Sequence, residues 1–525
     1  MSLPNKKSAI AVLILVVAGF LLAFSSFRYN SLNIVDPVYF RLYQHESEAL
    51  VLGKMLADRY QLDKRNETNL GFTTFDPAGW AYEIQHFIEP YKIISSDSFP
   101  KLEANPYPYQ VDGFQNSISF DGKSIAVYAV ESIFPYHGHR VVIDGTDVRT
   151  IVSSKYAYPY MILTLSGDPI VKGSISTVTI DSVPVDSGVG SFTNYSSQYG
   201  LQGKISSFLY NSAGLSFEAI QSLAAAVSAA TIVAFCVVAG RLVSPLFGII
   251  LYGSILLSPW LLLTARNLYW VPFTWFLPAV FGGLWLYSKK MISQAVCAFM
   301  VFASVLVKCL CGYEFITSVI LLSASFSAIY CAASNTLKEA FGHARKTILI
   351  CLVGVAGFVF ALCMHASRRG NTVWEGLVNI FEQDVKRRTY GGDSEGFDQL
   401  VKASLNASPL EVLNKYLSAW TTDIVVGIGG NSISILFGLA IVMIAYKLYS
   451  KESSWRKDLA VLVIFASVPL SWFILAKAHS YVHTHINFVL YYMGCVGAVF
   501  YVIAEGARSA LKNASIARSI KAETI

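Results

Sequence analysis

Two glutamates follow the first apolar segment of this 525-residue chain, in the stretch Gln44-His-Glu-Ser-Glu48. Carboxylates separated by one residue can supply a general base or hold a divalent metal ion. Acidic residues are also common in the first turn of a helix, where they compensate the helix dipole. The chemical hypothesis for Glu46 and Glu48 therefore depends on which other polar residues accompany them.

Two further segments place ionisable residues beside apolar stretches. Arg266 opens the aromatic run Arg266-Asn-Leu-Tyr-Trp270, and Lys308 and Glu314 flank a short segment between two apolar regions. A guanidinium suits phosphate because it can donate two parallel hydrogen bonds. The alternative is an interfacial role, since aromatic and ionisable residues are common where a helix leaves a membrane.

A long polar segment carries Arg369 and, further on, the basic run Lys386-Arg-Arg388. Arg387 and Arg388 can bind a lipid-linked phosphate or diphosphate through bidentate contacts. Pairing with acids that are close in sequence explains the basic residues equally well. These acids are Glu382, Asp384, Asp393 and Glu395.

Three histidines occur within seven residues in the segment Lys477-Ala-His-Ser-Tyr-Val-His-Thr-His485. His479 and His483 have the i,i+4 spacing that can hold a metal ion on a helix. The glutamate that follows the first histidine of a metalloprotease helix is absent from the sequence. We therefore favour a role in binding or orienting a substrate for Lys477, His479, His483 and His485, and we expect no metal there.

The composition indicates a membrane protein. Hydrophobic residues make up 54% of the chain and charged residues 14%, whereas a soluble globular protein carries about 25% charged residues. Such a deficit means that much of the surface faces lipid. The net charge of +6 is too small to argue for nucleic acid binding.

The apolar segments predict about ten transmembrane helices. The first, within residues 1–27, is long enough to cross a hydrocarbon core of ~30 Å, and we interpret it as an uncleaved anchor. Helices 2–7 are expected within residues 217–366 and helices 8–10 within residues 432–505. The fifth of the ten, at 293–307, is short, so we expect it to be tilted, or extended with Lys308 directed towards the interface.

Positive charge in the short loops sets the orientation. Lysine and arginine concentrate in every second short segment, which places both termini, including the tail 506–525, in the cytoplasm. Two long segments, 28–216 and 367–431, therefore lie on the other side of the membrane. The first carries the paired glutamates, and the second carries the basic run Lys386–Arg388.

The first outer segment is predicted to contain a folded domain. Alternating and β-branched runs between about residues 107 and 192 indicate a small antiparallel β domain. Residues 48–57 are amphipathic enough for a helix on the membrane surface, and residues 195–210 predict a second interfacial helix. The expected fold is mainly α and polytopic, with a β-rich domain inserted after the first helix.

These features together resemble the GT-C class of membrane glycosyltransferases. In that class the catalytic carboxylate lies in the first outer loop, and Glu46-Ser-Glu48 matches its position and its carboxylate-x-carboxylate form. Within the class, the segments 266–270, 312–314 and 477–485 look most like those of bacterial and phage transferases that add glucose to O-antigen, the serotype-converting type. The β-rich insertion departs from a minimal GT-C plan.

The resemblance implies a sugar donor linked to polyprenyl phosphate and a glycan acceptor such as O-antigen. It also implies a bacterial inner membrane, with the active site facing the periplasm. Glu46 or Glu48 would act as base in one inverting displacement. The donor would be bound by Arg266, Lys308, Glu314, Arg387, Arg388, Lys477, His479, His483 and His485. No cofactor is required, with Mg²⁺ or Mn²⁺ at the glutamates as the alternative.

Three other functions remain open at this point. An O-antigen polymerase or ligase handles related substrates but usually has its large loop late in the chain. A transporter or flippase of lipid-linked glycan predicts ionisable residues near the middle of the spans, whereas most charges here stop at span ends. A receptor or assembly factor would use the β domain as its active part.

Overall fold

The computed structural model describes most of the chain. The described residues are 6–59, 61–62, 69–75, 81–82, 114–115, 118–128, 139–157, 160–171, 175, 178–184, 191–389, 399–420 and 422–523. For some residues in these ranges only the backbone is described, and these include Glu46 and Arg387. Asp393 and Glu395 lie outside the described residues.

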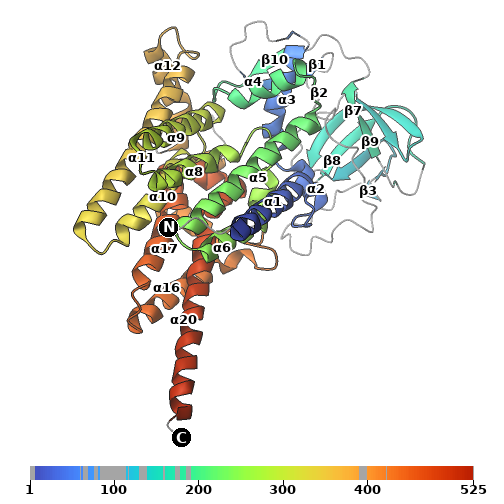
Figure 1. The fold of residues 1–525 in the computed structure, drawn as a ribbon. Helices are drawn as coiled ribbons and strands as arrows, with labels where there is room; N and C mark the ends of the chain where they lie inside the picture. Colours follow the sequence, from blue (N-terminus) through green and yellow to red (C-terminus); the bar gives the residue numbers. More distant parts are fainter. Residues whose placement is uncertain are drawn as a thin grey trace. The chain divides into compact units, whose positions relative to one another are not determined.

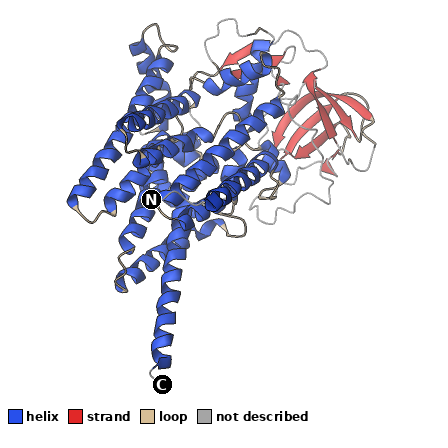
Figure 2. Ribbon diagram, viewed as in Figure 1, coloured by secondary structure: helices blue, strands red, loops and turns tan. Residues whose placement is uncertain are grey.

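The chain divides into two compact units. Unit 1 comprises Met1–Ile34, Ala224–Arg266 and Val271–Ile525, and unit 2 comprises Val35–Leu223 and Asn267–Trp270. The described part of unit 1 is built from helices, whereas the named strands all belong to unit 2, as Figure 2 shows by colour. This agrees with the expected helical membrane protein that carries a β-rich insertion.

Unit 1 consists of long helices joined by short ones (Figure 1). The long helices are α1 (Lys6–Tyr29), α5 (Phe217–Leu242, which begins in unit 2), α9 (Met291–Cys311), α11 (Leu337–Ala366), α17 (Trp455–Leu475) and α20 (Cys495–Glu523). Four shorter apolar helices are α6 (Pro245–Leu256), α8 (Phe273–Tyr287), α10 (Ile316–Ala332) and α16 (Ile433–Tyr449). The connecting elements are α7 (Pro259–Thr264), α12 (Val373–Ile380), the π-helix η3 (Phe381–Val385), α13 (Lys386–Arg388), α14 (Gln399–Asn406), α15 (Pro409–Ser418), η4 (Gly430–Ser432), α18 (Lys477–Val482), α19 (Thr484–Asn487) and η5 (Phe488–Tyr492).

Several of these helices are long and apolar enough to span a membrane. Among the described residues five pass this test: Val12–Tyr29 of α1, α5, α9, α11 and α17. Thr484–Tyr492 and Cys495–Ser519 pass it together as a pair bent by 45°. The helices α6, α8, α10 and α16 have only 12, 15, 17 and 17 residues, and a typical span needs about 20. A polytopic membrane protein is supported, and the number of ten spans stays a prediction.

The fifth predicted span is extended, but Lys308 does not reach towards the interface. Helix α9 has 21 residues and ends at Cys311. The Lys308 side chain is 3% exposed, and its Nζ donates to the carbonyl oxygen of Gly312 at 2.6 Å. The lysine therefore caps the last turn of its own helix, which satisfies a carbonyl that has no partner within the helix.

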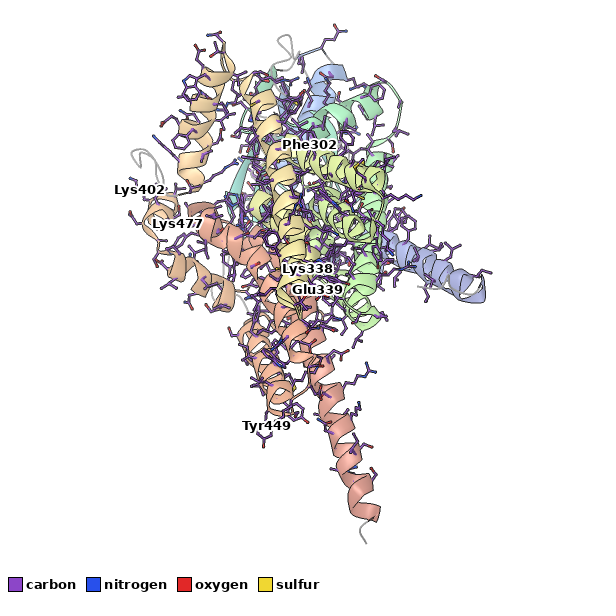
Figure 3. All side chains as sticks on the ribbon, turned by 60° about the vertical axis from the view of Figure 1, so that its left-hand side comes forward. Phe302, Lys338, Glu339, Lys402, Tyr449 and Lys477 are labelled. Carbon is purple, nitrogen blue, oxygen red and sulfur yellow. The ribbon has the colours of Figure 1, made fainter. Side chains whose placement is uncertain are left out.

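Small residues allow the helices of unit 1 to pack closely. A Cβ added at Gly282 of α8 would lie 1.9 Å from the carbonyl oxygen of Ser323 in α10. A Cβ at Gly357 of α11 would lie 2.6 Å from the carbonyl oxygen of Phe302 in α9, a residue labelled in Figure 3. Such close approach is typical of helix pairs in membranes, where van der Waals packing drives association.

Unit 2 combines helices with two antiparallel sheets. Its helices are α2 (Pro37–Leu42), α3 (His45–Arg59) and α4 (Leu201–Asn211). The smaller sheet has the order β10-β1-β2 and the larger one the order β3-β4-β5-β8-β7-β6-β9. The strands are β1 (Gly71–Phe75), β2 (Ala81–Tyr82), β3 (Phe114–Gln115), β4 (Ile118–Ser119), β5 (Ser124–Tyr128), β6 (His139–Ile143), β7 (Asp147–Ala157), β8 (Tyr160–Leu165), β9 (Val178–Pro184) and β10 (Ser191–Asn194).

The larger sheet occupies the region for which the sequence predicts β structure. Strands β5, β6, β8 and β9 overlap the runs that suggested it, and every pairing between them and their neighbours is antiparallel. The longest strand, β7, has 11 residues and was not anticipated. Its sequence Asp147-Val-Arg-Thr-Ile-Val-Ser-Ser-Lys-Tyr-Ala157 mixes polar residues without strict alternation, and a bulge between Ile151 and Ser153 interrupts its register.

The predicted surface helix over residues 48–57 is wrong. Each of these residues of α3 is buried. A helix on a membrane surface would instead have one apolar face that is not covered by protein and is exposed to lipid. A Cβ at Gly53 would lie 2.0 Å from the carbonyl oxygen of Gly71, so α3 packs directly on β1. The residues that looked amphipathic are instead enclosed by protein.

Helix α4 has the burial pattern of an interfacial helix. Its polar and small residues Gln202, Ser206 and Ser207 are buried, while Ile205 is 48% and Phe208 62% exposed. An apolar face that points away from the protein is typical of a helix that lies on a bilayer. Its place on the membrane, expected for residues 195–210, stays a prediction.

Candidate functional site

Glu48 lies in the interior of unit 2, near the start of α3. Its side chain is 6% exposed. Gln221 Nε2 donates to its two oxygens at 3.1 and 3.3 Å, and the backbone N–H of Leu268 donates to Oε1 at 2.9 Å. Hydrogen bonds to an ionised carboxylate are stronger than neutral ones. Glu48 therefore ties together segments that are 173 and 220 residues apart in sequence.

Further polar contacts hold the loop Asn267–Trp270 in place within unit 2. Asn267 Nδ2 donates to the carbonyl oxygen of Gln44 at 3.3 Å. Gln198 Nε2 donates to the Tyr269 hydroxyl at 2.6 Å, and Gln202 Nε2 donates to the Tyr269 carbonyl at 3.3 Å. Two of the segments singled out in the sequence, the paired glutamates and the aromatic run, are thus in contact. Arg266, at the end of the preceding segment, is half-buried.

The surroundings of Glu48 do not suit a metal ion. Mg²⁺ and Mn²⁺ are bound by oxygen ligands, whereas the Glu48 oxygens face N–H donors of Gln221 and Leu268. Across the described part of the chain, no group of three or more His, Cys, Asp or Glu side chains is arranged to hold a metal.

The segment that ends in the basic run Lys386–Arg388 forms one nearly continuous helical stretch, α12–η3–α13, in unit 1. Thr372 caps its start by accepting a hydrogen bond from the backbone N–H of Glu375. The π-helical part contains Asp384, which is 4% exposed and forms an ion pair with Arg369. Glu382 forms an ion pair with Lys386 at 2.5 Å. The pairing alternative thus holds for Arg369 and Lys386.

Arg388 lines a cavity of about 580 Å³ in unit 1. The walls come from the ends of α10, α11 and α17 and from α12–η3–α13. They are mainly apolar and aromatic, and the polar lining residues include Tyr313, Glu382, Asp384 and Arg388. The apolar wall residues include Ile316, Phe358, Leu362, Trp374, Leu377, Val378, Phe381, Trp472 and Leu475.

A tyrosine–histidine pair lies beside this cavity. The Tyr313 hydroxyl is 3.2 Å from His365 Nδ1, and the two rings are stacked with centroids 5.7 Å apart. Burial raises the pKa of the Tyr313 phenol, so that the hydroxyl stays protonated and can donate to the imidazole. Glu314, the next residue, is buried at 7% exposure. His365 was not among the predicted site residues, although it is an ionisable residue at the end of an apolar span.

Lys477 is buried and forms hydrogen bonds with backbone carbonyl oxygens. It is 6% exposed, and its Nζ donates to the carbonyl oxygens of Leu405 at 2.8 Å and Ala407 at 2.6 Å. In Figure 3 it lies beside the helix that carries Lys402, which is α14. The lysine therefore caps the C-terminal end of α14.

The three histidines form a row next to the cavity wall. Ring centroids are 4.5 Å apart for His479 and His483 and 5.6 Å apart for His483 and His485. His479 Nδ1 is 3.4 Å from the Asn487 amide nitrogen, and its ring packs edge-on against Trp472 at 5.7 Å. Trp472 is itself a wall residue of the cavity. The side chain of Trp472 thus connects the row of histidines to the cavity.

No protein-family model, no curated protein and no solved structure matches the chain. Within unit 1 the cavity brings together two of the predicted segments, represented by Tyr313 and Arg388, and Ala476 of its lining directly precedes the histidine segment. Within unit 2, Glu48 meets the aromatic run at Leu268.

Proposed function

We propose that the protein is a membrane glycosyltransferase that moves a sugar, expected to be glucose, from polyprenyl phosphate to a glycan acceptor such as O-antigen. The cavity of unit 1 carries the proposal. It lies where α10, α11 and α17 meet at one end of the bundle, and its lining is apolar except for a few polar groups. This arrangement suits an amphiphile whose tail lies among helices and whose head carries charge.

The size and polarity of the cavity support a lipid-linked substrate. Its volume of about 580 Å³ lies within the range of about 300–1,000 Å³ that is usual for ligand pockets. Arg388 can donate two hydrogen bonds to a phosphate. The charges of the neighbouring acids Asp384 and Glu382 are compensated by Arg369 and Lys386, so they do not create an uncompensated negative charge beside the phosphate.

The proposed reaction is a single displacement. A carboxylate takes the proton of an acceptor hydroxyl, the hydroxyl oxygen attacks the anomeric carbon, and the bond to the polyprenyl phosphate oxygen breaks. Attack from the face opposite the leaving group inverts the anomeric configuration. Arg388 stabilises the charge that develops on the leaving phosphate.

The paired glutamates are the proposed bases, and the contacts of Glu48 suit a different role. Glu48 is 6% exposed and accepts hydrogen bonds from Gln221 and Leu268. A base must come within hydrogen-bond reach of its substrate, and these contacts suit a positioning role better. We therefore propose Glu46 as the base and Glu48 as the residue that fixes the loop 267–270.

A transfer assay with the full chain in nanodiscs tests the proposal. With polyprenyl-phosphate glucose as donor and O-antigen as acceptor, Glu46→Gln should lower kcat by about 10²–10⁴-fold, the usual contribution of a general base. Arg388→Gln should lower kcat/KM for the donor. Lys402→Gln, which removes a cation from the same polar segment outside the cavity lining, is the matched control.

Three results would refute the assignment. Full activity in both Glu46→Gln and Glu48→Gln would exclude the carboxylates as bases. Movement of intact lipid-linked glycan across the membrane of sealed proteoliposomes that contain the protein, without formation of a glycosidic bond, would indicate a flippase. Addition of repeating units in place of one sugar would indicate a polymerase or ligase.

A further inference from the structure

Unit 2 contains a second depression, at the C-terminal ends of α3 and α4 and away from Glu48. It has a volume of about 600 Å³ and is lined by Asp58, Arg59, Tyr210, Asn211, Gly214 and the two residues that follow, Leu215 and Ser216. In contrast to the cavity of unit 1, its lining is rich in polar side chains. Asp58, Arg59 and Asn211 are exposed, so the depression is open to ligands of some length.

Buried residues hold its carboxylate in place. Lys54 is 2% exposed, and its Nζ lies 2.9 Å from Asp58 Oδ1. Ser207, which is 4% exposed, donates to Asp58 Oδ2 at 2.6 Å. Each carboxylate oxygen keeps lone-pair capacity for a further donor, because a carboxylate accepts about four hydrogen bonds. The depression thus presents a fixed acceptor whose position is set from the protein interior.

Asn211 is oriented by the same interior contacts. Its Nδ2 donates to the carbonyl oxygen of Met55 at 3.0 Å and to Ser207 Oγ at 3.1 Å. Both amide hydrogens are therefore used, and the bond to a carbonyl oxygen fixes which end of the amide is the nitrogen. The amide oxygen Oδ1 is left as a second acceptor.

Arg59 and Tyr210 supply a donor and an aromatic surface. Arg59 Nη1 donates a hydrogen bond to the Tyr210 hydroxyl, and the guanidinium carbon of Arg59 lies 5.4 Å from the centroid of the Tyr210 ring. Arginine has five N–H donors, so most remain for a ligand. Gly214 has no atom within 4 Å of the position of a Cβ, which leaves one side of the depression open.

We propose that this depression is a saccharide-binding subsite for the acceptor glycan. The Asp58 carboxylate and the Asn211 amide oxygen can accept hydrogen bonds from vicinal hydroxyls of a pyranose. The Arg59 guanidinium can donate to its oxygens, and the Tyr210 ring can pack against its apolar face. The ends of α3 and α4 that meet here are C-terminal, where the helix dipole disfavours anions. We therefore expect a neutral sugar and not a phosphate.

The position fits the proposed transfer reaction, on which this inference rests. Asp58 follows Glu48 by ten residues on the same helix, which corresponds to about 15 Å along its axis. A glycan whose reacting hydroxyl lies at the start of α3 would place a sugar several units away at the depression. The exposed apolar face of α4 would keep this end near the membrane that holds a lipid-linked acceptor.

Saturation-transfer NMR on the full chain in nanodiscs tests the subsite. The probes are maltoheptaose, a rhamnose-containing O-polysaccharide fragment and inorganic phosphate. At least one saccharide should give a signal, and Arg59→Gln and Tyr210→Leu should each weaken its binding about fivefold or more. Both residues lie at the surface of unit 2, so the fold should be retained. Arg140→Gln, at an exposed position of β6, is the control and should bind normally.

The outcomes separate this inference from the proposed function. Absence of any saccharide signal, unchanged binding in both variants, or binding of phosphate alone would overturn the subsite. Saccharide binding that depends on Arg59 and Tyr210 in a protein without transferase activity would overturn only the proposed function. If transfer occurs, both variants should raise the KM for the acceptor and leave the KM for the donor unchanged; an unchanged acceptor KM would overturn the subsite alone.

Discussion

At the scale of single residues, burial changes the interpretation of several charged side chains. Lys308 and Lys477 are both less than a tenth exposed and both donate to backbone carbonyls near helix ends. The sequence predicted that they bind the phosphate or the sugar of the donor. A buried ammonium that already donates to a carbonyl oxygen is poorly placed to bind a phosphate, so we assign both lysines a structural role. Among the predicted cations whose side chains are described, Arg388 lines the cavity.

Lys477→Met tests this structural role. The substitution leaves the carbonyl oxygens of Leu405 and Ala407 without the ammonium that they accept from, and a buried unsatisfied polar group costs about 1–3 kcal/mol. We expect a lower midpoint of thermal unfolding, measured by tryptophan fluorescence in detergent, and an unchanged KM for the donor. A raised KM at unchanged stability would show instead that Lys477 contacts the substrate.

At the scale of elements, an irregular helix shapes the cavity. The five π-helical residues of η3 interrupt the helical stretch between α12 and α13. Such insertions are rare and are often found at functional sites. Here the π-helical part contains both Glu382 and Asp384, which line the cavity and pair with Lys386 and Arg369. The local irregularity thus places two compensated charges beside an apolar space.

The hairpin of α16 and α17 contains a buried ion pair that can be tested. Lys447 Nζ lies 2.5 Å from Asp458 Oδ2, and the two side chains are 4% and 3% exposed. Lys447→Met alone leaves an uncompensated buried carboxylate and should destabilise the protein by about 3–5 kcal/mol. The double variant Lys447→Met/Asp458→Leu should recover most of the loss, because replacing both charges is often neutral.

Thermal unfolding of the two variants in detergent measures this difference. A double variant no more stable than Lys447→Met would contradict the explanation by an unpaired charge. It would then point to lost packing in the hairpin.

At the scale of the whole molecule, the distribution of positive charge predicts the orientation in the membrane. The positive-inside pattern places both termini in the cytoplasm and residues 28–216 on the opposite side. Gly145 offers an insertion point, because it lies in an exposed turn and nothing is within 4 Å of its Cβ position. Exposed turns of this kind tolerate insertions.

Epitope tags at Gly145 and after Ile525 test the orientation. In sealed spheroplasts, an antibody should reach the tag at Gly145 and should reach the C-terminal tag only after lysis. Access to both tags before lysis, or to neither, would show that the predicted topology is wrong.

The amino-acid sequence by itself determined the membrane class, the β-rich region and the segments that carry polar chemistry. These properties follow from composition and from local periodicity, which need no knowledge of distant contacts. Only the tertiary structure decided which polar residues are enclosed. Glu48 and Lys477 look like accessible site residues in the sequence, but their hydrogen-bond partners are 173 and 72 residues away.

The same limit explains the error at residues 48–57 and the unforeseen depression at Asp58. An amphipathic pattern shows that a helix has two faces, but it does not show whether lipid or protein covers them. Asp58 and Tyr210 are 152 residues apart, and no local pattern connects them. Burial and convergence are properties of the packed chain, so they become visible only when α3, α4 and β1 are seen together.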